Sequence, residues 1–333
     1  MIYTVTLNPA LDREYEVAAL AFGEVLRASA VREDLGGKGF NVSRALLALG
    51  APSVAVGLVG GHAGRRIAEG LAALGLATEL VEVAGGETRT NVTVVAPDRH
   101  VKVNEPGPAI GPDEEARLVA RVRALARAGD LWVLSGSLPP GARPELYAEL
   151  VRIVQGAGAR ALLDTSGPAL REGCAAAPFL VKPNAAEARE LTGLPLSATG
   201  AAVPLALSVA ARSAAESKGE VPPASDLAAV LDAVHQLGPA HVLLTRGADG
   251  AVLSDAARTW RATPPVIEER NPIGAGDALL GGVAFGLARG LALPEALRWG
   301  VAAGAAAASL PGTAVGDREL VERLAAGVAV REG

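Results

Sequence analysis

The sequence predicts an α/β protein built on a mostly parallel central sheet that helices cover on both faces. Short apolar runs alternate with helix-period segments along most of the 333 residues, which is typical of repeated strand-helix units. The 40 glycines and 22 prolines fall between these segments and are more numerous than a helical bundle tolerates. A hydrophobic content of 50% suffices for one large core or two modest domains.

The predicted strands are short apolar runs that end at glycine, proline or a polar residue. They lie at residues 2–7, 53–59, 131–135, 161–163, 179–181 and 242–245. Helix-period segments lie between them, at residues 41–49, 63–74, 112–128, 144–155, 185–192, 227–237 and 275–289. Several of these segments are followed at once by glycine, which favours the left-handed conformation that ends a helix.

Two regions depart from this alternation, because their strand-like stretches have no helix between them. They lie at residues 13–35 and 87–103, and we expect them to form a small antiparallel sheet that acts as a lid. The remaining residues, 1–12, 36–86 and 104–333, are assigned to the α/β core. A segment at about 197–225, rich in Ala, Ser and Pro, is expected to be an insertion in that core.

The composition argues against several classes of protein. A net charge of −5 and a pI near 5.6 provide no basic surface, so nucleic acid is not an expected partner. The chain opens on a strand-like run rather than a signal peptide, and the Ala-rich stretch at 299–310 is too short to span a bilayer. The single cysteine, Cys174, can form no intramolecular disulfide, so the cytoplasm is the expected location.

The most informative motif is Gly-Ala-Gly-Asp at 274–277, directly before an apolar helix. Small residues at a helix N-terminus let backbone N–H groups approach an anion, and the helix dipole favours negative charge there. Asp277 would lie beside this anion hole, where it could take a proton from an attacking hydroxyl group. The alternative is that Asp277 is only an ordinary acidic residue in the first turn of a helix.

A second glycine-rich turn, at 36–44, also leads into a predicted helix. Its Lys38 and Asn41 offer a cation and an amide to polar substrate groups, although a turn of this kind alone could be a tight connection. Neither turn has the GxxxxGK[ST] pattern of P-loop proteins, and neither has the GxGxxG fingerprint in a strand-turn-helix setting. The sequence therefore disfavours P-loop and dinucleotide-binding folds.

Together with five further runs, these two motifs occur in the order typical of one enzyme family. The runs are TVTLNPALD at 4–12, TRTN at 88–91, NEPGP at 104–108, SGSLPPG at 135–141 and KPNAAE at 182–187. On these residues the chain resembles the ribokinase-like sugar kinases of the phosphofructokinase B group along nearly its whole length. The first and third runs look most like the 1-phosphofructokinase branch, with tagatose-6-phosphate kinases close to it.

The resemblance implies a ribokinase-like α/β fold and phosphorylation of fructose 1-phosphate to fructose 1,6-bisphosphate, with ATP and Mg²⁺. Tagatose 6-phosphate and fructose 6-phosphate are alternative substrates on the same fold. A non-catalytic sugar-phosphate sensor is an alternative of a different class, against which Asp277 argues. In the family pattern Asp277 is the catalytic base, and the N–H groups of Gly274, Ala275 and Gly276 form the anion hole.

The resemblance also implies which residues hold the sugar phosphate. Those matching the sugar-binding positions are Asp12, Gly37, Lys38, Asn41 and Ser137. Arg89 and Lys102 fall on lid segments that meet the phosphate already on the substrate, and cationic donors suit a dianion. Their alternative role is that of solvated charges on edge strands. Arg27 could join them from a neighbouring subunit, if a homodimer forms through the lids.

Nucleotide and metal positions follow from the same resemblance. Asn184 and Glu187 match an NxxE motif that organises Mg²⁺, often through water, and residues i and i+3 share one helix face. The alternative is a helix cap with Glu in the first turn, and both roles can coexist. The matching nucleotide-binding residues are Lys182, Asn184, Thr245, Gly247 and Gly276. One departure is Ala278, where the family commonly has Ser or Thr.

Overall fold

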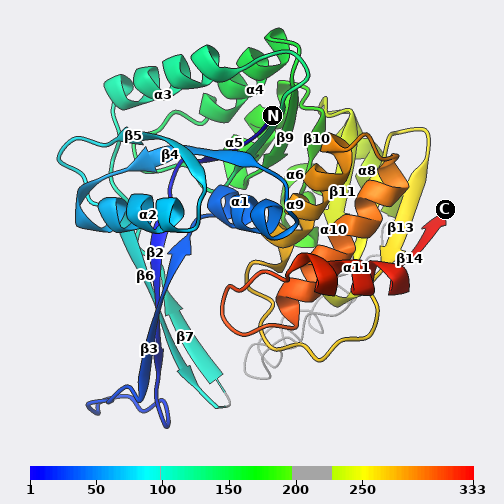
Figure 1. Ribbon diagram of the computed structural model, residues 1–333. Helices are drawn as coiled ribbons and strands as arrows, with labels where there is room; N and C mark the ends of the chain where they lie inside the picture. Colours follow the sequence, from blue (N-terminus) through cyan, green and yellow to red (C-terminus); the bar gives the residue numbers. More distant parts are fainter. Residues whose placement is uncertain (98, 197–226) are drawn as a thin grey trace, which may run out of the picture.

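The computed structural model describes residues 1–97, 99–196 and 227–333 (Figure 1). The insertion expected at about 197–225 therefore lies outside the described residues. The predicted α/β class is confirmed, with one large sheet, helices packed on it and a small second sheet. No helix in the described ranges is long and apolar enough to cross a membrane.

The large sheet has ten strands in the order β14-β13-β12-β11-β10-β9-β8-β1-β4-β5. In chain order these strands are β1 (Ile2–Thr6), β4 (Ser53–Val59), β5 (Ala77–Glu82), β8 (Leu131–Ser135), β9 (Arg160–Asp164), β10 (Leu180–Val181), β11 (His241–Thr245), β12 (Ala251–Ser254), β13 (Thr259–Thr263) and β14 (Ala329–Glu332). Every pairing from β5 to β11 is parallel, and those from β11 to β14 are antiparallel. Carboxyl ends of the parallel strands therefore meet at one edge, where α/β proteins bind ligands.

Helices follow most of the strands. They are α1 (Lys38–Ala48), α2 (Gly61–Ala73), α3 (Pro112–Leu125), α4 (Leu146–Gly156), α5 (Gly167–Ala175), α6 (Ala185–Thr192), α8 (Leu227–His235), α9 (Ala275–Ala288), α10 (Leu293–Ala308) and α11 (Arg318–Gly327), with the 3₁₀ turn η1 (Gly247–Asp249). The Ala-rich stretch at 299–310 lies mostly in α10, whose residues are largely buried, as expected for a core helix.

Side chains of β8 show that both faces of the sheet are covered. Leu131 and Val133 are buried in one cluster with residues of α1, α9, α10 and α11. Trp132 and Leu134 are buried in the other cluster, with residues of α3, α4, α5, α6 and α8. Because successive strand residues point to opposite faces, this alternation places β8 inside a three-layer core.

The small sheet has the order β3-β2-β6-β7, and Figure 1 shows it extending away from the layered core. Its strands are β2 (Ala10–Glu16), β3 (Ala30–Gly36), β6 (Arg89–Ala96) and β7 (Arg99–Val103). The two outer pairings are antiparallel, whereas the central pairing of β2 with β6 is parallel. Since β2 begins at Ala10, the sheet includes Asp12, which the sequence-based boundary at 12/13 assigned to the core.

Helices α9 and α10 pack along a seam of small residues. A Cβ at Gly282 would lie 2.5 Å from the carbonyl oxygen of Trp299, and one at Gly300 would lie 2.5 Å from a methyl group of Val283. Neither glycine has room for a side chain, so the two helix backbones are in direct contact. This contact fixes α9, whose first turn carries Asp277.

Candidate active site

The turn before α9 carries the three backbone N–H groups that the sequence analysis assigned to an anion hole. Gly274 is the residue before the helix and has a φ of 82°, a left-handed conformation that glycine adopts at no steric cost. The N–H of Ala275 donates to the carbonyl of Pro272 at 3.2 Å. Within the described chain, the N–H groups of Gly274 and Gly276 have no hydrogen-bond acceptor, so these two are available to an anion.

Asp277 lies in the first turn of α9 and is only 8% exposed. The side-chain amide of Asn41, on α1, donates to its Oδ2 at 2.9 Å. Burial, together with the charge of Asp164, raises the pKa of Asp277 to about 6, although the Asn41 hydrogen bond opposes the shift. A carboxylate with this pKa is ionised at neutral pH and still accepts a proton more readily than an exposed aspartate.

Asp164 lies at the end of β9, fully buried, between two lysines. Lys38 Nζ donates to its Oδ1 at 2.9 Å, and Lys182 Nζ lies 3.1 Å from its Oδ2. Burial alone would raise the pKa of Asp164, but the charges of Lys182 and Lys38 outweigh it and lower the pKa. The triad therefore holds two ammonium groups in place with one carboxylate.

The Lys182 ammonium also lies beside the anion hole. A Cβ at Gly276 would be 3.8 Å from Lys182 Nζ, so the glycine leaves open space between the ammonium and the α9 turn. From the sequence, Asp164 was a plausible polar neighbour of the site because it ends a predicted strand, with a purely structural role as the alternative. Its two lysine partners were not predicted.

The predicted sugar-binding residues Asp12 and Gly37 flank the start of α1. Asn91 Nδ2 donates to Asp12 Oδ1 at 2.7 Å across the paired strands β2 and β6. The other carboxylate oxygen of Asp12 lies against Gly36, where a Cβ would be 2.2 Å away. Gly37 precedes α1 with a φ of 128°, which L side chains rarely adopt. Asn91 was not singled out from the sequence.

Arg89 and Lys102 both lie on the small sheet near Asp12. Burial raises the pKa of Asp12, and the charges of Lys102 and Arg89 are among the groups that oppose this shift. Arg89 is half-buried, with Nη2 donating to the Asn8 carbonyl at 2.9 Å and Nη1 to the Glu105 carbonyl at 3.2 Å. Lys102 is exposed on β7.

Two predicted residues, Ser137 and Arg27, have few contacts with the other candidate residues. Ser137 follows β8, and its Oγ is 3.5 Å from the Asn8 side-chain amide. Arg27 lies in the exposed connection between β2 and β3, and no contact within the described chain brings it to the other candidate residues.

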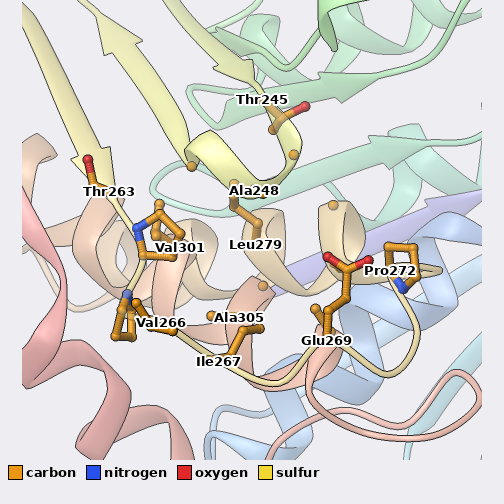
Figure 2. A pocket seen from close by; sticks show the side chains of 18 residues that line it. Thr245, Ala248, Thr263, Val266, Ile267, Glu269, Pro272, Leu279, Val301 and Ala305 are labelled. Carbon is orange, nitrogen blue, oxygen red and sulfur yellow. The ribbon is translucent and has the colours of Figure 1, made fainter. Parts of the chain in front are cut away.

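A cavity of about 510 Å³ lies between the β11–β12 turn, the segment after β13, and helices α9 and α10. Figure 2 shows Thr245 at the top of the view, Pro272 and Glu269 at the right, Thr263 and Val301 at the left, and the apolar side chain of Leu279 near the centre. The predicted nucleotide residues Thr245, Gly247 and Gly276 all line it. Its apolar walls were not predicted, because residues such as Leu279 look like ordinary core positions in a sequence.

The NxxE motif forms a reciprocal helix cap at the start of α6. Asn184 Oδ1 accepts from the N–H groups of Ala186 and Glu187, both at 2.9 Å, and Glu187 Oε2 accepts from the N–H of Asn184 at 2.8 Å. The capping alternative is thus present. Glu187 Oε1 keeps no partner in the described chain, where no group of three or more acidic, His or Cys side chains could hold a metal directly. These donors fit a hydrated Mg²⁺ rather than a protein cage.

Comparison with known proteins identifies the family to which this chain belongs. The chain matches the pfkB family carbohydrate kinases over residues 6–319. It is 38% identical over 305 residues to a 1-phosphofructokinase of Rhodobacter capsulatus (89% of this chain, 87% of that protein) and 32% identical over 324 residues to that of Bacillus subtilis (97% of each). It also resembles phosphofructokinase-2 of Escherichia coli solved with fructose-6-phosphate, with a TM-score of 0.81, 29% identity and 98% of each chain covered. The chain therefore belongs to the pfkB family of carbohydrate kinases and is a sugar kinase.

Proposed function

We propose that this kinase transfers the γ-phosphoryl group of ATP to the free primary hydroxyl of fructose 1-phosphate and releases fructose 1,6-bisphosphate and ADP. The relatives named 1-phosphofructokinase support the choice of sugar. The observation that carries the chemistry is Asp277, buried beside two available N–H groups and the Lys182 ammonium, with a pKa of about 6.

In the proposed reaction the sugar C6 hydroxyl oxygen attacks the γ-phosphorus, and the bond from that phosphorus to the β–γ bridging oxygen breaks. Asp277 takes the hydroxyl proton, which prevents the attacking oxygen from carrying a positive charge. The N–H groups of Gly274 and Gly276 and the Lys182 ammonium stabilise the charge on the transferring group. Most of the acceleration would come from positioning and electrostatics.

The 510 Å³ cavity is proposed to take the nucleotide. Its apolar walls suit an adenine ring, and Thr245 and Gly247 offer polar groups at the turn. Glu187 Oε1 would hold Mg²⁺ through water, with Asn184 keeping the helix start in shape. The metal would neutralise part of the phosphate charge.

The fructose 1-phosphate site is proposed to lie between the core and the small sheet. Asp12, Lys38 and Asn41, together with the Gly37 turn and Ser137, would hold the sugar hydroxyls. Arg89 and Lys102 would bind the phosphate that the sugar already carries. We propose that the segments 13–35 and 87–103 act as a lid that closes over this site.

A homodimer through the lids is part of the proposal. Phe22 is fully exposed, and Val25 and Val103 on the same sheet and its connection are 81% and 60% exposed. Exposed apolar side chains of this kind favour a protein partner, and a second copy would bring its own Arg27 near the site.

A coupled ADP-release assay tests the choice of sugar through kcat/KM, because discrimination resides in relative transition-state binding. We expect fructose 1-phosphate to exceed fructose 6-phosphate, tagatose 6-phosphate and fructose. Fructose 6-phosphate is the second candidate, since the similar E. coli structure holds it. A higher kcat/KM for either 6-phosphate would overturn the substrate assignment, and no ADP release with any sugar phosphate would favour a sensor.

A further inference from the structure

Asn8 lies at a junction that none of the proposed roles uses. It follows β1, is only 5% exposed, and its side-chain amide reaches two other loops. Nδ2 lies 3.0 Å from the Pro106 carbonyl, 3.3 Å from the Leu138 carbonyl and 3.5 Å from Ser137 Oγ. One buried amide thus joins the loop after β1, the loop after β7 and the loop after β8.

The same residue closes a ring of hydrogen bonds around Arg89. The Asn8 carbonyl accepts from Arg89 Nη2 at 2.9 Å, and the Glu105 carbonyl accepts from Arg89 Nη1 at 3.2 Å. Pro106, the residue after Glu105, accepts from the Asn8 amide. The guanidinium is therefore held between two carbonyl groups whose separation the Asn8 side chain fixes.

Glu105 adds a second tie to the same strand. Its Oε2 accepts from the backbone N–H of Thr90 at 2.7 Å, next to Arg89 on β6. The segment 104–108 is thus bound to β6 by Glu105 and to the loop after β1 by Asn8. Without Asn8, one side of this attachment would be lost.

Asn8 packs closely against Gly107, and one of its polar atoms is buried without a hydrogen-bond partner. The second feature lowers stability, which argues against an incidental contact. A Cβ at Gly107 would lie 2.2 Å from Asn8 Oδ1, and Gly107 has a φ of 93°. Asn8 Oδ1 is itself buried and has no hydrogen-bond partner in the described part of the chain. A buried acceptor left unpaired is destabilising, so the Oδ1 atom of Asn8 lowers the stability of the fold. The Nδ2 atom, by contrast, makes the hydrogen bonds that join the loops.

We propose that Asn8 is a positioning residue of the sugar-phosphate site, which sets the place of the Arg89 guanidinium and of Ser137 without touching the substrate. The inference rests on the proposed role of Arg89 as a ligand of the substrate phosphate. The Asn8 Nδ2 group is already engaged by the Pro106 and Leu138 carbonyls, so Asn8 acts through the carbonyl groups that hold Arg89.

The test compares Asn8→Ala with Thr4→Val and Arg89→Ala in the full chain. Thr4→Val removes a buried hydrogen bond to Ser43, 2.7 Å long, from the same strand region and serves as the matched control. For Asn8→Ala we expect the KM for fructose 1-phosphate to rise about tenfold, with kcat and the KM for ATP within about twofold of the wild type. A general loss of packing would change all three parameters.

The variants separate two kinds of failure. If Arg89→Ala raises the KM for the sugar phosphate and Asn8→Ala behaves like Thr4→Val, the role of Asn8 is wrong and the proposed function stands. If Arg89→Ala leaves that KM unchanged, the assignment of Arg89 itself fails, and the inference fails with it.

A double-mutant cycle with Gly107→Ala gives a second test of the Asn8 contact, and its first arm does not depend on the Asn8→Ala protein. Gly107→Ala should raise the KM for fructose 1-phosphate in the wild type, because its methyl group would displace the Asn8 amide. Added to Asn8→Ala, it should have a smaller effect, since the colliding side chain is gone and only the backbone strain of an alanine at a φ of 93° remains. Equal effects of Gly107→Ala in both backgrounds would contradict the proposal.

Discussion

The two sides of the candidate site are held by different forces. On the transfer side, Asp164 pairs with Lys182 and with Lys38, which is also proposed to reach the sugar. Asp277 is held there by the Asn41 amide. On the sugar-phosphate side, Arg89 is held by main-chain carbonyls of the connecting loops. Interactions between charged side chains therefore dominate on the transfer side, and hydrogen bonds to main-chain carbonyls position Arg89 on the sugar-phosphate side.

From this difference we expect two kinds of kinetic defect, one for each side of the site. Buried charges tune the pKa of Asp277, so substitutions among them should change kcat and its pH dependence. Carbonyl groups place Arg89 without altering the base, so substitutions around it should change the KM for the sugar.

Asp277→Asn should have the largest effect, since it keeps the shape of the base and removes its ability to accept a proton. We expect kcat to fall by roughly 100-fold or more, as is usual when a general base is lost. Calorimetry should show fructose 1-phosphate binding with near-normal affinity. Near-native turnover would remove Asp277 from its proposed role.

Asp164→Asn should lower kcat by about 10- to 100-fold, because both lysines lose their common partner. It should also change the pH profile. Asp277 works only when ionised, so wild-type kcat should fall as the pH drops through about 6. Since the Asp164 charge raises the pKa of Asp277, its removal should move this acidic limb to lower pH.

The matched control for Asp164→Asn is Asp130→Asn. Asp130 is also buried next to a strand, but it pairs with the N-terminal ammonium at 2.9 Å. Its loss should leave the position of the acidic limb unchanged. If both variants shift the limb alike, the charge of Asp164 is not what tunes the base.

Arg89→Ala should raise the KM for fructose 1-phosphate by about tenfold to 100-fold and leave that for ATP nearly unchanged, as expected on removing a charge-assisted contact. Lys102→Ala should have a smaller effect, because Lys102 is exposed and its charge is screened. Arg121→Ala, which breaks a surface ion pair with Glu79, is the control. A large fall in kcat for Arg89→Ala would break the division between the two sides.

Phe22→Asp should have the smallest effect on chemistry and act on assembly instead. Phe22 is fully exposed, so the change removes no core packing, and it should shift a lid-mediated dimer towards monomer in sedimentation velocity. Leu47→Asp, on the exposed side of α1, should not. An unchanged sedimentation coefficient for Phe22→Asp would place any dimer contact elsewhere.

The sequence predicted much of the fold, because apolar runs and glycines carry the strand and helix signals. The strand predicted at 131–135 is β8, and the helix at 185–192 is α6, with the same bounds. Strands such as β12 and β13 were missed. They are only four and five residues long, so although β13 alternates the buried Trp260 with the exposed Arg261 as a half-buried strand does, too few residues carry the period for it to stand out in the sequence.

The site was predictable where residue type and local spacing carry the chemistry, as at 274–277. It was not predictable where the role depends on contacts between distant segments. Lys38 and Asp164 are 126 residues apart in the chain, and Asn8 and Leu138 are 130 apart. No local pattern records such pairs. The roles assigned to the predicted site residues stay predictions until the variants above are measured.

The seam between α9 and α10 has a consequence for how this enzyme tolerates change. Since Gly282 and Gly300 bring the two backbones into contact, a larger residue at either position must push the helices apart. Asp277 lies in the first turn of α9 and Gly274 directly precedes the helix, so both would move with it. Mutations in this seam, remote from any ligand, would therefore appear in a screen as catalytic defects in addition to losses of stability.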